Sequence, residues 1–202
     1  MIVKICGITR LVDARAAVNA GATWLGFNFY PKSPRYVPPE KVAGIIAELP
    51  RSIVSVGVFV NETPDAVAAV AERAGLDRVQ LHGDEPPADI TALARWQPLK
   101  ALALRTEADL AMLDAYAEAL LLIDAPTPEY GGSGQVGDWE LARRAAADHR
   151  ILLAGGLTAD NVAAAIAAVA PWGVDVASGV EASKGIKDPA RIHAFCAAAL
   201  GR

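Results

Sequence analysis

The sequence predicts an α/β protein that folds as one compact (β/α)8 barrel, the TIM barrel, and three observations lead to that prediction. Short β-branched or leucine-rich runs alternate with alanine-rich helical patterns through all 202 residues. There are eight such runs, and a helix-like pattern follows each of them. No Gly/Ser-rich linker or change of composition divides the chain, so we expect a single domain over residues 1–202.

The expected strands are short and almost continuously apolar, which is typical of strands buried on both faces. Strict alternation with helices requires these strands to be parallel. In chain order they are Ile2–Cys6, Trp24–Phe29, Ile53–Val60, Arg78–His82, Leu99–Leu104, Ala119–Asp124, Ile151–Ala154 and Val174–Ala177.

Helix-start residues precede several of the helical patterns. Thr63-Pro64 and Thr158-Ala159 open two of them, and the proline pairs Pro38-Pro39 and Pro86-Pro87 open two more. Proline suits a first helical turn because the amide hydrogen that it lacks would have no partner there. The residue pattern of the fifth helix, Ala108–Tyr116, does not determine whether that helix is regular.

Parallel strands in this order fit either an open doubly wound sheet or a closed eight-stranded barrel. The count of eight favours the barrel, and the chain length falls at the compact end of the barrel's range. No G-x-G-x-x-G follows the first strand, which weakens the dinucleotide-binding alternative.

Composition and charge narrow the possible partners. Hydrophobic residues make up 53% of the chain, and the formal net charge is −4. No basic footprint for nucleic acid or polybasic membrane anchor is present, so we expect small-molecule partners, no nucleic acid and no membrane. The N-terminus lacks a signal-peptide pattern, and Cys6 and Cys196 make a poor disulfide framework. We therefore expect a cytoplasmic protein with two free thiols.

In a (β/α)8 barrel the chemistry gathers at the carboxyl ends of the strands. Those positions are unusually polar here: Cys6 ends the first strand, His82 the fourth, Asp124 the sixth and Asp175 the eighth, while Arg35 lies in the loop after the second. Gln80 shares a face with His82, and Leu122 shares one with Asp124. Strand parity alone does not tell which of these columns faces inward.

Glycines follow the last two strands, at Gly155-Gly156 and at Ser178-Gly179. Exposed amides at this place commonly hold a phosphate group, which predicts a phosphorylated substrate. The alternative is that Gly-Gly only makes a turn into a helix. Gly131, Gly132 and Ser133 lie in a long loop after the sixth strand, which suits a lid over a ligand or an ordinary connection.

Each candidate side chain also has a structural alternative. Free cysteine is usually a small buried hydrophobe, which is how we interpret Cys196 and one way to interpret Cys6. Asp124 follows an apolar run, so its carboxylate needs hydrogen bonds, a raised pKa, or an Asx turn into the next loop. His82 fits a packed histidine, and Arg35 fits either a solvated cation or a fork for a planar carboxylate.

Seven stretches together resemble the phosphoribosylanthranilate isomerase family of tryptophan biosynthesis. They occur in the expected order, at the expected strand ends, and span essentially the whole chain: KICGIT, GFNFYPKSPRY, VGVFVN, VQLHGDE, LLIDAPTPEYGGSG, LLAGGLTADNV and VDVASGVE. The resemblance implies an Amadori rearrangement of N-(5-phosphoribosyl)anthranilate to 1-(2-carboxyphenylamino)-1-deoxyribulose 5-phosphate, with no metal and no organic cofactor.

By the same resemblance, Asp124 is the general acid that opens the ribose ring and Cys6, as thiolate, is the base that removes the C2 proton. Arg35 would hold the anthranilate carboxylate, and His82 and Asp175 would lie near its amine or the sugar. Gly155, Gly156, Ser178 and Gly179 would hold the phosphate, beneath a lid of Gly131, Gly132 and Ser133. The acid must keep its proton near neutral pH, and the thiol needs the opposite adjustment.

The rivals are other phosphosugar barrels and a non-catalytic barrel that binds a phosphorylated regulator. A triosephosphate isomerase requires a glutamate base at a strand end, and a ribulose-phosphate epimerase requires a metal site built from His and Asp. The residues of this chain supply neither pattern clearly. The histidine-pathway isomerase of aminoaldoses uses two aspartates, whereas position 6 is a cysteine here. Monomer and homodimer are both open, because an isologous patch on a helical shell has no sequence signature.

Overall fold

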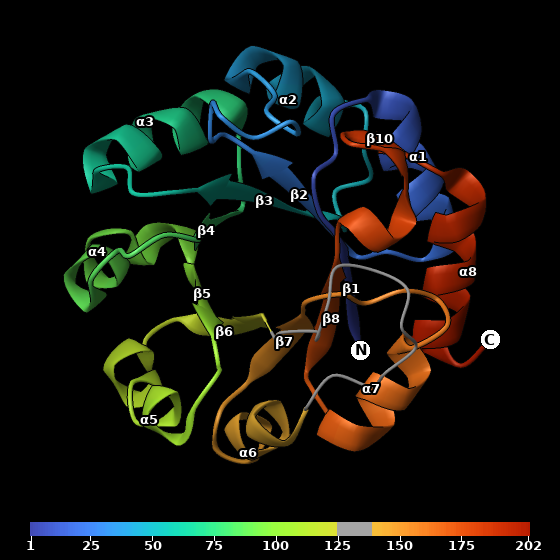
Figure 1. The fold of residues 1–202 in the computed structure, drawn as a ribbon. Helices are drawn as coiled ribbons and strands as arrows, with labels where there is room; N and C mark the ends of the chain where they lie inside the picture. The colour runs from blue at the N-terminus through green and yellow to red at the C-terminus, as the bar shows by residue number, and fades with distance from the viewer. Residues whose placement is uncertain (125–138) are drawn as a thin grey trace.

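The computed structural model describes residues 1–124 and 139–202, and its eight main strands close into one parallel barrel (Figure 1). β1 pairs with both β2 and β8, which closes the sheet and excludes the open doubly wound arrangement. The strands are β1 (Ile2–Ile5), β2 (Trp24–Asn28), β3 (Val54–Phe59), β4 (Arg78–Leu81), β5 (Leu99–Ala103), β6 (Leu120–Asp124), β7 (Ile151–Ala154) and β8 (Gly173–Val176).

Helices surround the barrel, and three of the four expected helix starts are confirmed. The helix expected from Thr158-Ala159 starts later, at Val162, with Asn161 at its N-cap position. Thr63 caps α3 by accepting a hydrogen bond from the Ala66 amide at 3.3 Å, and proline pairs open α2 and α4. The helices are α1 (Leu11–Ala20), α2 (Pro39–Ala47), α3 (Pro64–Ala74), α4 (Pro87–Ala92), α5 (Glu107–Leu110), α6 (Glu140–Asp148), α7 (Val162–Val169) and α8 (Pro189–Leu200), with the 3-10 turns η1 (Ala94–Trp96), η2 (Leu113–Tyr116) and η3 (Ser178–Val180).

The open question of the fifth helix is settled against a regular helix. A capping box between Thr106 and Asp109 starts α5, which lasts only four residues before the chain turns into η2. Each observed strand otherwise lies within two residues of its expected bounds.

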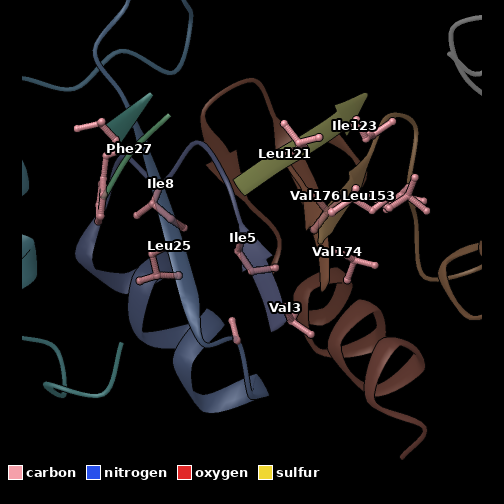
Figure 2. Close-up of a cluster of buried hydrophobic side chains, with 14 of the residues drawn as sticks. Val3, Ile5, Ile8, Leu25, Phe27, Leu121, Ile123, Leu153, Val174 and Val176 are labelled. Carbon is pink, nitrogen blue, oxygen red and sulfur yellow. The ribbon is translucent and has the colours of Figure 1, made fainter. Parts of the chain in front are cut away.

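The strands divide the apolar side chains between two cores. Val3 and Ile5 point outward and pack with helix residues in a large outer core, part of which Figure 2 shows. A smaller inner core fills the barrel with residues such as Trp24, Leu99 and Leu122. Because side chains alternate along a strand, Leu122 places Asp124 in an inward column, and Val3 and Ile5 place Lys4 in another.

A short hairpin not expected from the sequence follows η3. Its strands, β9 (Glu181–Ser183) and β10 (Ile186–Lys187), are too short to give a periodic signal. The Thr9 hydroxyl donates to the Gly185 carbonyl at 2.6 Å, which ties the hairpin turn to the loop after β1. No helix within residues 1–124 or 139–202 is long and apolar enough to cross a membrane.

Candidate active site

Cys6 lies directly after β1, inside the carboxyl end of the barrel. Its amide continues the β1–β8 ladder by donating to the Val176 carbonyl at 2.8 Å. A Cβ on Gly26 of β2 would stand only 2.7 Å from the Cys6 sulfur, so the thiol occupies space that only glycine leaves open. Cys6 is half-buried, whereas the second free cysteine, Cys196, is fully buried in the outer core. The expectation that Cys196 is core filler is confirmed.

A buried ion pair lies one layer below Cys6. Lys4 and Asp175 face each other in register on β1 and β8, with the Lys4 Nζ 2.9 Å from the Asp175 Oδ1. Lys4 has no solvent exposure at all, so its ammonium depends on protein partners. Sequence reasoning missed Lys4, although a lysine within the apolar run IVKIC, two residues from Cys6, signals a charge beside the thiol.

Burial and the nearby cations shift the pKa of the Cys6 thiol in opposite directions. Burial raises the pKa of the thiol, Lys4 and Lys187 lower it, Asp175 raises it further, and the balance stays above the usual value. For Lys4, burial opposes the ammonium, but Asp175 and Cys6 together hold its pKa above normal. The expectation of a thiol adjusted towards the thiolate is therefore wrong for the free protein, because desolvation outweighs the nearby cations.

Asp124 ends β6 at the top of its inward column. Burial raises the pKa of this carboxyl group; His82 and Arg105 lower it, and Asp175 raises it. The direction agrees with the expectation of a carboxylic acid that keeps its proton, and the first cause is burial rather than crowding by other charges.

His82 follows β4 and is fixed by its neighbour two residues back. The Gln80 Nε2 lies 2.8 Å from the His82 Nδ1, so Gln80 donates when the ring proton is on Nε2. Desolvation lowers the pKa of His82, and Asp124 opposes that change. The Gln80 Oε1 is buried without a hydrogen-bond partner in the described part of the chain. His82 thus lies within electrostatic reach of Asp124.

Arg35, in the loop after β2, makes a bidentate ion pair with Glu181. The Arg35 Nε and Nη2 donate to the two Glu181 oxygens, each at 2.7 Å. The solvated-cation alternative is wrong, because the side chain is only 22% exposed and is held by a buried carboxylate. Glu181 was missed as a site residue; no local pattern marks it beyond its place at the end of VDVASGVE.

The loops after β7 and β8 meet at the expected phosphate position. Gly155 and Gly156 have φ values of 90° and 58°, which favour glycine. A Cβ on Gly179 would lie 2.0 Å from the Leu157 carbonyl oxygen, so the two loops touch there. The amides of these residues and of Ser178 have no hydrogen-bond acceptor among the described residues.

Two further expectations concern the lid and a metal. Gly131, Gly132 and Ser133 lie outside the described residues, so the lid stays a prediction. Residues 1–124 and 139–202 hold no group of three or more His, Cys, Asp or Glu side chains arranged for a metal ion.

Fold and site place this chain in the class of (β/α)8-barrel enzymes that carry acid–base groups at the strand ends. Residues 3–198 match the family model described as N-(5'phosphoribosyl)anthranilate (PRA) isomerase, and the chain belongs to that family. It is therefore an isomerase, and tryptophan biosynthesis is its pathway.

Relatives cover the whole chain. The N-(5'-phosphoribosyl)anthranilate isomerase of Citrifermentans bemidjiense is 51% identical over 198 residues, 98% of this chain and 96% of that protein. The crystal structure of the isomerase from Thermotoga maritima matches with a TM-score of 0.94 at 46% identity, covering both chains fully. A PRA isomerase in complex with reduced 1-(o-carboxyphenylamino)-1-deoxyribulose 5-phosphate matches with a TM-score of 0.90 at 42% identity, again over both full chains.

Proposed function

We propose that this site converts N-(5'-phosphoribosyl)anthranilate to 1-(2-carboxyphenylamino)-1-deoxyribulose 5-phosphate, with Asp124 as general acid and Cys6 as general base. One observation carries the proposal. Asp175 acts electrostatically on both groups, so the acid of β6 and the thiol after β1 lie within reach of one residue at the same barrel end. An aldose-to-ketose rearrangement needs such a pair of proton-transfer groups facing one substrate.

Asp124 acts first. Burial raises its pKa and so favours the protonated carboxyl group, which donates its proton to the ribose ring oxygen. The C1–O bond breaks as the proton arrives, and the nitrogen lone pair forms the iminium ion. The carboxylate left behind is stabilised by His82 and Arg105, which lower its pKa.

Cys6 acts second, on the iminium ion. Its thiolate takes the proton from C2, the C2–H electron pair forms the enolamine, and tautomerisation gives the ketone. Because burial raises the thiol pKa, the thiolate is a minor form of the free protein but a stronger base once formed. Protons are the only particles exchanged, so the steps as written use no electron acceptor.

Other residues bind and orient the substrate in this proposal. Arg35 holds the anthranilate carboxylate, while His82 and Asp175 lie near the anthranilate amine and the sugar. The free amides of Gly155, Gly156, Ser178 and Gly179 hold the phosphate. The loop around Gly131, Gly132 and Ser133 closes over it. Asp175 uses Oδ1 for Lys4 and keeps Oδ2 for a substrate contact.

The proposed reaction and the two free thiols also bear on the cellular compartment and the partners of the protein. Cys6 and Cys196 are both unpaired, which supports a reducing cytoplasm. Phosphoribosylanthranilate is the small-molecule partner, and a monomer and a homodimer stay equally open.

Steady-state turnover of phosphoribosylanthranilate, followed by its fluorescence, tests the assignment. We expect Cys6→Ala and Asp124→Asn each to lower kcat by about a hundredfold or more while product still binds, since a positioned acid or base contributes roughly 10² to 10⁴. Cys196→Ala, which removes the other thiol from the outer core, is the matched control and should keep normal kcat. An inactive wild type, or a normal Cys6→Ala variant, contradicts the proposal.

A further inference from the structure

We infer that Glu181 is a positioning residue for substrate recognition: it holds one edge of the Arg35 guanidinium so that the other edge meets the substrate carboxylate. The inference rests on the proposed function and deepens it, because it explains how Arg35 selects an anthranilate-bearing sugar phosphate. Glu181 acts through Arg35 and touches no reacting atom.

The contact between the two side chains fixes the plane of the guanidinium. Arg35 donates from Nε and Nη2 to the two Glu181 oxygens at 2.7 Å each, a fork-to-fork pair. Guanidinium has five N–H groups, and this pair engages two of them. The two protons of Nη1 and the second proton of Nη2 have no acceptor within the described residues. One Nη1 proton and this Nη2 proton form a second fork on the adjacent edge of the planar group.

Glu181 is itself held, so it cannot follow Arg35 as a loose counter-ion would. Its side chain is 5% exposed, and its Oε1 accepts from the Lys187 Nζ at 3.0 Å and from the Gly185 amide at 3.2 Å. Lys187 also donates to the Ala177 carbonyl at 2.9 Å. The hairpin after β8 therefore anchors the carboxylate that orients a side chain of the loop after β2.

Two glycines show that the arrangement needs close approach. A Cβ on Gly7 would lie 2.5 Å from the Arg35 Cδ, and Gly7 has a φ of +75°. A Cβ on Gly185 would lie 2.9 Å from the Pro34 carbonyl oxygen. The Arg35 side chain thus runs across the residue that follows Cys6, which places an oriented cation next to the proposed base.

Removing the Glu181 charge should weaken binding of an anionic ligand if Glu181 orients Arg35, but strengthen it if only net charge matters. The direction of the change in affinity therefore tests the inference. Arg35 and Lys187 are cationic and Glu181 is anionic, so neutralising Glu181 makes the cluster more positive. If charge alone governed binding, an anionic ligand would then bind more tightly. If orientation governs it, the ligand binds more weakly because the fork is no longer fixed.

The test measures calorimetric binding of two ligands to the full chain. One is reduced 1-(o-carboxyphenylamino)-1-deoxyribulose 5-phosphate, and the other is the same compound without the ring carboxylate. We expect Glu181→Gln to weaken the first by about tenfold, or 1.4 kcal/mol, and the second by less than about twofold. In turnover, KM should rise more than kcat falls.

Three further variants make the result decisive. Glu181→Asp keeps the charge but is too short for both Arg35 nitrogens, so it should weaken the first ligand selectively even if Glu181→Gln does not fold. Glu48→Gln, in the exposed Arg15–Glu48 pair, is the matched control and should change neither ligand. Arg35→Met tests the proposed carboxylate contact itself.

Arg35→Met separates a failure of the carboxylate contact from a failure of the positioning role of Glu181. If Arg35→Met discriminates between the ligands but Glu181→Gln and Glu181→Asp do not, the carboxylate site stands and the positioning role is overturned. Tighter binding in Glu181→Gln, or equal loss of both ligands, also overturns it. If Arg35→Met itself fails to discriminate, the proposed carboxylate contact is wrong, and the role of Glu181 falls with it.

Discussion

Two buried lysine–carboxylate pairs lie on opposite sides of the same barrel sheet. Lys4–Asp175 joins β1 to β8 inside the barrel at 2.9 Å, and Lys100–Glu85 joins β5 to the loop after β4 at 2.6 Å. Both lysines are almost completely buried, at 0% and 1% exposure. The two lysines point to opposite faces of the sheet. Lys4 points into the barrel, whereas Lys100 lies between Leu99 and Ala101 of the inner core and therefore points outward.

The two lysines lie on opposite sides of the barrel sheet, and their hydrogen-bond partners also differ. Lys100 donates to the Gly83 carbonyl as well as to Glu85, and Glu85 accepts from the amides of Asn61 and Gly83. Lys4 has Asp175 as its one hydrogen-bonded oxygen among the described residues, and its charge also lowers the pKa of the Cys6 thiol and of His82. The Lys100–Glu85 pair, with more hydrogen-bond partners, stabilises loops, whereas the Lys4–Asp175 pair supplies charge to a reactive group.

Of the two lysines, Lys4 should have the larger effect on catalysis, because Lys4→Met removes a charge that both balances Asp175 and lowers the Cys6 pKa. We expect turnover to fall by about tenfold or more, the equivalent of roughly 1.4 kcal/mol. In a Cys196→Ala background, the pH profile of Cys6 alkylation by iodoacetamide should move to higher pH.

Lys4→Arg keeps the cation and serves as the control, so its alkylation profile should stay nearer that of the wild type. An unchanged profile in Lys4→Met would show that Lys4 balances Asp175 and has no influence on the thiol.

Lys100→Met should reduce stability and leave the chemistry intact. Losing one partner of a buried pair typically costs about 3 to 5 kcal/mol, since the other charge stays buried. Urea unfolding measures this loss, and kcat per folded molecule should stay within about twofold of wild type. A shifted Cys6 alkylation profile in this variant would break the distinction between the two pairs.

The sequence predicted the barrel because strand and helix periodicity are local properties that recur eight times. It also predicted which polar residues stand at the strand ends, since Cys6, His82 and Asp124 each close an apolar run. It did not predict the Arg35–Glu181 pair, which joins residues 146 positions apart through a hairpin too short to leave a pattern.

The sequence also did not predict the direction in which the Cys6 pKa is shifted. Residue types suggest that a base beside cations favours the thiolate, but the outcome depends on how desolvation compares with Lys4 and Lys187 in three dimensions. Lys187 is 181 positions from Cys6 in the chain, so no local pattern shows that it lies near the thiol. The pairing of Lys4 with Asp175 becomes visible only once the β1–β8 register is known.

The smallest expected effect is on how the stability contributed by each lysine–carboxylate pair changes as pH falls. For Glu85, burial works against the carboxylate, but Lys100 and backbone amides hold its pKa below the usual value. Its stabilising contribution is therefore present above the unfolded pKa of about 4.3 and is lost as pH falls through the folded pKa. Without Lys100 the buried carboxylate binds a proton more readily, so acid relieves part of the penalty in Lys100→Met.

The stability difference between wild type and Lys100→Met should therefore shrink by about 1 kcal/mol or more between pH 6 and pH 3.5. Urea unfolding at intervals across that range measures it. Arg15→Met, in an exposed pair, should differ from wild type by less than about 1 kcal/mol at every pH. For Lys4, burial opposes the ammonium, but Asp175 and Cys6 hold its pKa above normal, so the contribution of the Lys4 ammonium is lost as pH rises through the folded pKa. A pH-independent penalty in Lys100→Met would mean that the backbone amides alone keep Glu85 ionised, and that the two pairs differ less than their geometry indicates.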